Sequence, residues 1–545
     1  MSVPPAPGRP HASGAPRASF ASGPDWVRDA VFYQIFVDRF AASARVPKPG
    51  EMEPWDAPPT IHGFKGGDLL GIAEHLDDLA ALGITALYLT PVFASASNHR
   101  YHTFDYENVD PLLGGNAALR ELLDAAHARG MRVILDGVFN HASRGFWPFH
   151  HVLENGAASP YRDWFVLNSD VRAGRRGLIA YPGTHEIDAA ARLQSDNDPN
   201  GADEAIETTA MHRMLGYKAW WDMPALPKLN HANPEVREYI YRVAEGWLRF
   251  GIDGWRLDVP EEITEPGFWE EFRRRCLAVN PEAYIVGEIW NPAPEWLAGD
   301  RFDALMNYPL AEAILSFTGA GRLDADLVAT THEFSRHVRD DDGPEFARRL
   351  ADVMATYPPD ITSLQLNLLD SHDTPRFLSL AGGDATALRL AALIQMTLPG
   401  APCIYYGDEV GLDGRADPDC RRAYPWDVAR QDRSLRDFVA GLTAMRHAHP
   451  ALRRGRFEVL AAEGSAVAYG LFGADTSMVV VVNAGDSPAR LGFELPGPAS
   501  GSVEQVSWAG REWRSTFAPR PIERGTLVVD VEAREGVVLE VHPAL

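Results

Sequence analysis

Eight short apolar runs recur along the chain, and stretches with helical periodicity separate them. Helical periodicity is clearest over about residues 69–82 and 117–129, and another helix begins near Pro234. Strands that alternate with amphipathic helices form a parallel sheet, and eight strand–helix units are the number that closes a barrel. The apolar runs are residues 31–37, 84–90, 131–136, 252–258, 283–288, 302–307, 364–370 and 402–406. The sequence therefore predicts an α/β fold built on a (β/α)₈ TIM barrel.

The chain of 545 residues is long enough for more than one folded unit. Residues 1–24 are rich in Pro, Ala, Gly and Ser, and we expect a disordered leader because they bury too little apolar surface to offset their ordering entropy. We assign the barrel to residues 25–141 and 227–452. Residues 142–226 interrupt the strand–helix alternation after the third strand, and so long an excursion predicts an inserted functional region. Apolar segments that alternate with turn residues predict a C-terminal antiparallel β-sandwich domain over 453–545.

The composition excludes several classes of partner. The chain has 51 Lys and Arg against 75 Asp and Glu, and its formal net charge of -24 repels nucleic-acid phosphates and anionic membrane surfaces. Three cysteines are too few for a disulfide framework or a Cys-rich zinc site. The N-terminus lacks the apolar segment of a secretion signal, and no later run reaches the roughly 18 apolar residues of a membrane span. We therefore expect a cytoplasmic protein without nucleic-acid or membrane partners.

Carboxylates stand where four of the predicted strands end. From strands three, four, five and seven they are Asp136, Asp258, Glu288 and Asp373. A single carboxylate in such a position is more often a helix cap or a solvated charge. Four of them at the C-terminal ends of barrel strands share one rim, which is where barrel enzymes place catalytic groups. The pattern therefore predicts an acidic active site.

Two of these carboxylates have neighbours that favour opposite charge states. Side chains alternate along a strand, so Arg256 shares a face with Asp258, and a guanidinium there favours the ionised carboxylate. Glu288 follows the apolar run AYIVG, and a less polar environment raises the pKa of a carboxyl and keeps it protonated. One ionised and one protonated carboxyl that face each other are the groups used in glycoside hydrolysis.

Four segments resemble, in order and with barrel-compatible spacing, the signature regions of the α-amylase family, glycoside hydrolase family 13. The segments are DGVFNH (136–141), GWRLDVP (254–260), GEIW (287–290) and LLDSHDTPR (368–376), and the resemblance spans about residues 26–452. It implies an α-glucan substrate, with Asp258 as nucleophile, Glu288 as general acid/base and Asp373 as the carboxylate that holds sugar hydroxyls in the distorted ring. It also implies that residues 142–226 form the family's domain B.

The same resemblance gives roles to residues around the three carboxylates. It implies that Arg256 orients Asp258, that two histidines hydrogen-bond the sugar at subsite −1, and that a tyrosine stacks on the sugar near a further histidine. These substrate-binding residues are His141, His372, Tyr101 and His99. Asp136 and Asn140 match positions that brace strand three and its junction with domain B. Calcium is common in the family, but no run of Asp, Asn and Glu here resembles a ligand loop, so we assign no metal and no cofactor.

The segment LPKLN (226–230) resembles the fifth conserved segment of neopullulanases, cyclomaltodextrinases and maltogenic amylases. This similarity implies cleavage of α-1,4-glucosidic bonds in maltooligosaccharides, cyclodextrins and pullulan. Leu226, Asn291 and the pair Pro260 and Glu261 depart from the residues usual in that subgroup. The first strand begins near residue 31, so we do not expect the subgroup's N-terminal β domain, and the oligomeric state is left open.

Other interpretations remain open. The resemblance implies a retaining mechanism, in which Asp258 forms a covalent glycosyl-enzyme intermediate. An α-glucosidase, or a glucan transferase or isomerase of the trehalose synthase or sucrose-acting type, would share that intermediate, and LPKLN argues against it. A non-catalytic sugar-binding homologue is disfavoured because all three carboxylates are in place.

The excursion over 142–226 is rich in tryptophan. An aromatic face can stack on a sugar ring, but large aromatic residues more often fill a small core. We therefore predict that four tryptophans form the core of this region, namely Trp147, Trp164, Trp220 and Trp221.

Overall fold

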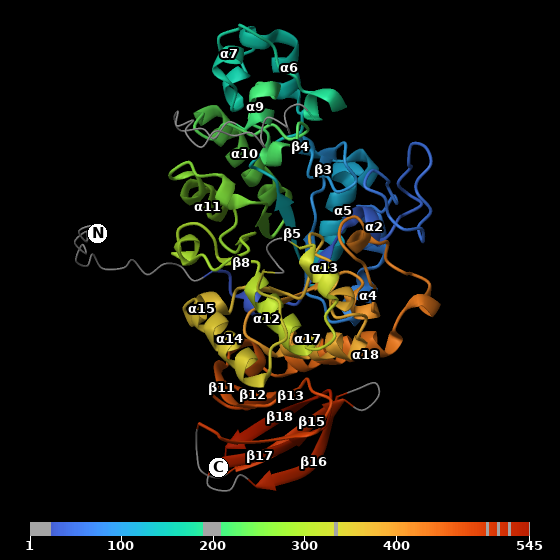
Figure 1. Ribbon diagram of the computed structural model, residues 1–545, viewed down its shortest axis with the longest axis vertical. Helices are drawn as coiled ribbons and strands as arrows, with labels where there is room; N and C mark the ends of the chain where they lie inside the picture. The colour runs from blue at the N-terminus through green and yellow to red at the C-terminus, as the bar shows by residue number, and fades with distance from the viewer. Residues whose placement is uncertain are drawn as a thin grey trace, which may run out of the picture.

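The computed structural model of the protein describes residues 23–188, 209–331, 336–496, 501–508, 513–521 and 525–543. The inserted region, the barrel and a β domain follow one another along the longest axis (Figure 1). The leader predicted for residues 1–24 lies outside the described residues, apart from Gly23 and Pro24. The residue boundaries that we assign between the domains stay predictions.

Eight parallel strands form the barrel. They are β1 (Phe32–Ile35), β2 (Ala86–Leu89), β5 (Arg132–Gly137), β6 (Gly254–Leu257), β7 (Tyr284–Gly287), β8 (Ala304–Leu305), β9 (Leu366–Leu368) and β10 (Ala401–Tyr405). Their order is β8, β7, β6, β5, β2, β1, β10, β9, and a parallel bridge between Met306 and Leu366 joins the two ends. Helices cover the outside and side chains fill the inside, so nearly every strand residue is buried. The predicted TIM barrel is confirmed.

The barrel helices begin and end at caps that the sequence shows. In α10 (Pro234–Phe250), Asn233 accepts a hydrogen bond from the N–H of Glu235, and Gly251 ends the helix with a φ of 113°. The helix predicted over 69–82 is two helices, α3 (Leu69–Glu74) and α4 (Leu76–Ala81), which meet at His75. None of the helices in the described ranges is long and apolar enough to cross a membrane.

The other helices of the barrel layer are α1 (Trp26–Asp29), α2 (Val37–Phe40), α5 (Gly115–Ala128), α11 (Phe268–Val279), α12 (Tyr308–Thr318), α13 (Ala325–Ala329), α14 (Gly343–Ala355), α15 (Pro359–Thr362), α16 (Phe377–Leu380), α17 (Ala385–Thr397), α18 (Arg433–Ala448) and α19 (Ala451–Arg454).

Short β-bridges fasten the inserted region to the rim of the barrel. Its helices are α6 (Trp147–Asn155), α7 (Ser169–Arg172) and α9 (Ala210–Leu215), and a hairpin of β3 (Phe93–Ser95) and β4 (Thr103–Val109) lies beside it (Figure 1). Lys228 pairs with His141, and Leu229 pairs with Phe165. The segment LPKLN therefore connects the inserted region to the end of β5.

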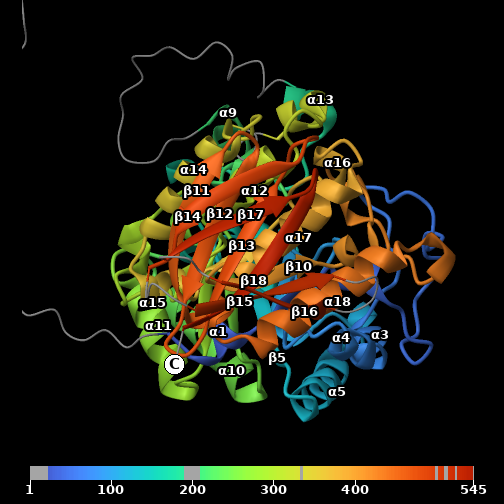
Figure 2. The same cartoon turned by 90° about the horizontal axis from the view of Figure 1, so that it is seen from below.

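The C-terminal domain consists of two antiparallel sheets, as predicted. One sheet has the order β11, β12, β13, β18, β15, β16, and the other pairs β14 with β17. Val479, Leu491 and Val529 belong to the apolar core between them. Seen from below, the larger sheet lies across α14 and α17 of the barrel (Figure 2). The strands are β11 (Arg456–Glu463), β12 (Ala466–Phe472), β13 (Ser477–Asn483), β14 (Ala489–Glu494), β15 (Gly501–Trp508), β16 (Trp513–Pro521), β17 (Thr526–Val531) and β18 (Glu535–Pro543).

Candidate active site

The parallel register of the barrel brings acidic side chains to one rim. Asp136 in β5 and Arg256 in β6 are register partners. Asp258 comes directly after β6, and Glu288 directly after β7. The C-terminal ends of parallel barrel strands point the same way, so these groups meet although they are far apart in sequence.

Arg256 is the centre of this cluster and is fully buried. Its Nη1 donates to Asp136 Oδ1 at 2.9 Å and to Asp258 Oδ1 at 3.2 Å. Its Nη2 lies 2.9 Å from Glu288 Oε2. One guanidinium therefore faces three carboxyl groups, and charge-assisted contacts of this kind are strong in a desolvated site.

Burial is the main cause of the pKa shifts of Asp258 and Glu288. It raises the pKa of Asp258 well above the usual range, and the negative charge of Glu288 raises that pKa further. Burial also raises the pKa of Glu288 to about 7, against the lowering effect of Arg256. The two groups interact strongly, so they titrate as a pair, and the pair retains a proton near neutral pH.

Glu288 accepts hydrogen bonds from two donors that the sequence does not predict. The backbone N–H of Val259 donates to its Oε2 at 3.1 Å, and Nε1 of Trp290 donates to its Oε1 at 3.3 Å. Val259 has a left-handed backbone with a φ of 35°, which is strained for a β-branched residue and is the kind of outlier found at active sites. Burial still raises the pKa of Glu288 in the predicted direction, although the N–H of Val259 lowers it.

A chain of hydrogen bonds fixes His372 and Tyr101. The side-chain amide of Gln34 lies 2.8 Å from His372 Nδ1, and His372 Nε2 lies 2.5 Å from the Tyr101 hydroxyl. That hydroxyl donates to Asp136 Oδ2 at 2.8 Å. Burial lowers the pKa of His372 well below its usual range, so the ring is neutral. With the amide donating to Nδ1, the ring proton lies on Nε2.

Asp373 and His99 lie beside this chain. Asp373 is partly exposed, and its carboxylate oxygens lie 3.1 Å from His372 Nε2 and 3.4 Å from Arg421 Nη2. His99 Nδ1 accepts from the backbone N–H of Tyr101 at 3.2 Å, and the two rings are 5.7 Å apart. The structure thus gathers the predicted carboxylates, His372, Tyr101 and His99 at one rim.

His141 and Asn140 lie on the side of the inserted region. Both are buried, and burial lowers the pKa of His141 to about 3. The backbone carbonyl of Asn140 accepts from the N–H of Leu229 at 3.1 Å, which braces the junction with the LPKLN segment. The ring of His141 stacks on Trp220 with centroids 4.9 Å apart.

The tryptophans of the inserted region do not all form its core. Trp164 is 9% exposed and fits that prediction. Trp147 is 55% exposed and Trp221 is 78% exposed, so the prediction is wrong for both. Trp220 packs on His141 at the rim instead.

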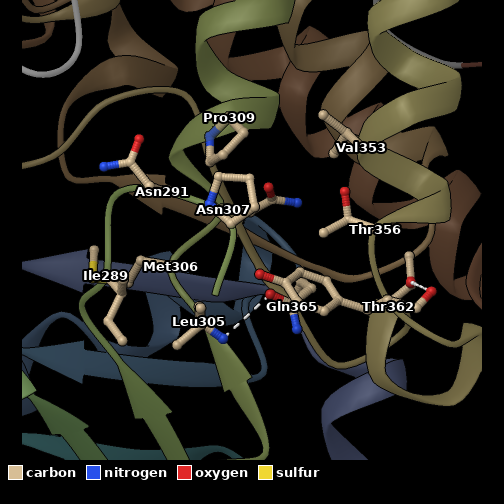
Figure 3. Close-up of a pocket in the computed structure, with 12 residues that line it drawn as sticks. Ile289, Asn291, Leu305, Met306, Asn307, Pro309, Val353, Thr356, Thr362 and Gln365 are labelled. Carbon is tan, nitrogen blue, oxygen red and sulfur yellow. Dashed lines mark hydrogen bonds between the residues drawn. The ribbon is translucent and has the colours of Figure 1, made fainter. Parts of the chain in front are cut away.

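A small cavity lies between the segments that follow β7 and β8 and the end of α14 (Figure 3). Its volume is about 20 Å³, which is room for about one water molecule and far too little for a sugar. Asn291 and Asn307 line it, and Gln365 accepts a hydrogen bond from the N–H of Leu305 at its wall. This cavity is therefore too small to hold a substrate.

Three contributors were missed by the sequence analysis. Gln34 is the one polar residue in the apolar run VFYQIFV, and that contrast is a usable signal. Tyr88 donates to Asp136 Oδ2 at 2.8 Å. A tyrosine in an apolar strand is normally interpreted as a core residue, so the sequence gives no sign of this contact. Arg421 contacts Asp373 from a loop after β10, where no periodic pattern singles it out.

The model of the α-amylase catalytic domain matches residues 34–455. The chain belongs to the α-amylase family. A cyclomaltodextrinase of Geobacillus thermopakistaniensis is 41% identical over 87% of this chain and 72% of its own length. Neopullulanase 2 of Thermoactinomyces vulgaris is 37% identical over 96% of this chain and 79% of its own length. The crystal structure of a debranching enzyme from Nostoc punctiforme is 43% identical, with a TM-score of 0.77, over 95% of this chain and 99% of that one. The protein is a glycosidase of this family.

We expect kcat/KM to fall as the pH rises above about 7, where the buried carboxyl pair loses its retained proton. Activity falls with rising pH because a carboxyl with a raised pKa is protonated below about pH 7 and loses its proton above it. The general acid is then missing. A kcat/KM profile on a maltooligosaccharide from about pH 5 to about pH 9 measures this. A profile that stays flat across the alkaline half would contradict the shared-proton interpretation.

Proposed function

We propose that this glycosidase is a retaining enzyme that cleaves α-1,4-glucosidic bonds through a covalent glycosyl-enzyme intermediate. The observation that carries the proposal is the contact of one buried guanidinium with both Asp258 and Glu288. A group that touches both carboxyls holds them on one side of the barrel mouth, close to each other. Retaining glycosidases need such a pair about 5–5.5 Å apart.

In the proposed first step, the Asp258 carboxylate attacks the anomeric carbon while Glu288 gives its proton to the departing glycosidic oxygen. The carboxylate left on Glu288 lies beside Arg256 and the N–H of Val259, so its new charge is stabilised. In the second step Glu288 takes a proton from water, and the resulting hydroxide attacks the anomeric carbon and releases Asp258.

Three further groups support this reaction. The neutral His372 presents its Nε2 proton at the rim, and Tyr101 adds an aromatic face that is held by its hydrogen bond to Asp136. Asp373 is partly exposed and anchored from one side, so it keeps acceptor capacity for sugar hydroxyls. These contacts strengthen as the ring distorts in the transition state.

The proposed substrates are maltooligosaccharides and cyclodextrins, with pullulan as a weaker one. The support is the similarity to the cyclomaltodextrinase and neopullulanase, together with the LPKLN segment. The structure places that segment at the rim: Lys228 Nζ donates to the backbone carbonyl of Glu262, which follows Asp258 on the same loop. Changes in this segment can therefore alter the cleft.

A second candidate is cleavage of α-1,6 bonds. It is favoured by the Nostoc debranching enzyme, because that protein covers almost the same span as this chain. Both candidates use the same carboxyl pair, so the linkage preference depends on the shape of the cleft.

Replacing Asp258 by Asn, or Glu288 by Gln, should lower kcat by several powers of ten, since an amide is neither a nucleophile nor an acid here. The matched control is Glu265→Gln, which changes a partly exposed carboxylate farther along the loop after β6. Thermal melts should show all three variants folded. Near-normal turnover by either active-site variant would refute the assignment of the pair.

The first sugar released should be the α-anomer, because the proposed carboxyl separation leaves no room for a water between the groups. Proton NMR of the earliest products on a maltooligosaccharide reads the configuration directly. Initial accumulation of the β-anomer would mean that Asp258 acts as a base.

We expect kcat/KM to rank maltooligosaccharides and cyclodextrins above pullulan, and pullulan above starch. Differences of about ten to a few hundredfold need only about 1–3 kcal/mol of differential transition-state binding. The products from pullulan separate the two linkage candidates, because cleavage at α-1,4 bonds gives panose or isopanose and cleavage at α-1,6 bonds gives maltotriose. Reaction only with sucrose, or conversion of maltose to trehalose, would instead support a transferase or isomerase.

A further inference from the structure

The described part of the inserted region carries one tryptophan that is mostly exposed near the active-site rim. Trp221 is 78% exposed, a higher fraction than that of the other large apolar side chains exposed in the described ranges. Tryptophan has a large apolar surface, and leaving it in water is unfavourable unless something covers it. Its exposure therefore needs an explanation.

Trp221 is the outer ring of an aromatic stack that starts at the rim. Its ring lies 4.8 Å from that of Trp220, with the planes 11° apart. Trp220 in turn lies 4.9 Å from His141, also at 11°. The three rings are close to parallel, so Trp221 lies two stacking distances from His141, which follows β5 at the rim of the barrel.

The backbone holds Trp221 outward at a conformational cost. Trp221 has φ 50° and ψ 33°, and Asp222 has a φ of 57°. The left-handed region is unfavourable for residues with a side chain, and two successive ones are strained. Such outliers persist only where the surroundings fix them, and they cluster at ligand-binding sites.

Contacts to Asp222 and to the preceding Trp220 fix the loop. Thr209 donates its hydroxyl proton to the Asp222 carboxylate at 2.7 Å, and His212 Nε2 lies 2.9 Å from the same carboxylate. The N–H of Trp220 donates to the carbonyl of Leu226 at 2.9 Å. The loop is therefore pinned at its base, and the ring of Trp221 needs little ordering before it binds a ligand.

We propose that the outer face of Trp221 is a stacking platform for a glucose ring of an α-glucan whose cleaved bond lies at Asp258 and Glu288. The apolar face of a pyranose ring is the ligand that matches a flat, solvent-exposed aromatic face on a glycosidase. Because the platform stands two stacking distances beyond His141, only a chain of several glucose units spans both places. This site rests on the proposed α-glucan specificity and deepens it.

The decisive variant is Trp221→Gly, because glycine removes the ring and also favours the left-handed backbone. Its melting temperature should match or exceed that of the parent enzyme. We expect kcat/KM on maltoheptaose to fall about tenfold, which corresponds to about 1.4 kcal/mol, with kcat/KM on maltotriose nearly unchanged. Trp221→Tyr should restore most of the loss, because it returns an aromatic face.

Trp147→Ala is the matched control, since it removes another exposed tryptophan from α6 of the same region. It should leave kcat/KM on both maltotriose and maltoheptaose unchanged. The stacking proposal would be overturned if Trp221→Gly lowered kcat/KM equally on both substrates, or if it left kcat/KM on maltoheptaose unchanged.

A binding measurement separates this proposal from the proposed chemistry. In the Glu288→Gln background, maltoheptaose should change the tryptophan fluorescence, and adding Trp221→Gly should raise its Kd about tenfold. Weak activity of the parent on every α-glucan would refute the proposed function. If the parent is active but the Glu288→Gln variant binds maltoheptaose with the same Kd whether or not it also carries Trp221→Gly, the stacking proposal is refuted and the proposed function is not.

Discussion

One buried positive charge faces three carboxyl groups, and the chemistry of the rim depends on that imbalance. Arg256 cannot neutralise Asp136, Asp258 and Glu288 together, and three ionised carboxylates with one cation are too costly to bury. The cluster therefore retains a proton. Without Arg256 all three carboxyls would favour the protonated form, whereas a second cation would ionise them. A single guanidinium leaves the mixed state that glycoside hydrolysis requires.

The barrel makes this cluster, because its groups come from several neighbouring strands. Gln34 lies on β1, Asp136 on β5 and Arg256 on β6, while Glu288 follows β7. A register shift by one residue would turn Arg256 toward the helix layer and leave the carboxylates without their cation. The bridge between Met306 and Leu366 closes the ring, so no strand can slide independently of its neighbours. Precision at the rim is thus a property of the closed sheet.

The sequence predicts the barrel well because its strands are buried on both faces and stand out as apolar runs. It does not predict the break at His75, whose ring stacks on Trp426 at 3.6 Å, since that contact joins distant parts of the chain. The site residues follow from motifs, but their charge states do not. The donors to Glu288 are the backbone of Val259 and the indole of Trp290, and neither donation can be read from residue types.

The two strained loops near the rim are both held in unfavourable backbone conformations by their surroundings. Val259 beside Glu288 and Trp221 beyond His141 both hold left-handed backbones that their side chains disfavour. Each conformation is fixed by surrounding hydrogen bonds, and the stability that it costs comes from the large buried core of the barrel. A loop ordered in advance spends little binding free energy on its own ordering. In the proposed mechanism, more of the energy from glucan contacts then remains for distorting the sugar ring at Asp258, so strain in the free enzyme would favour the transition state.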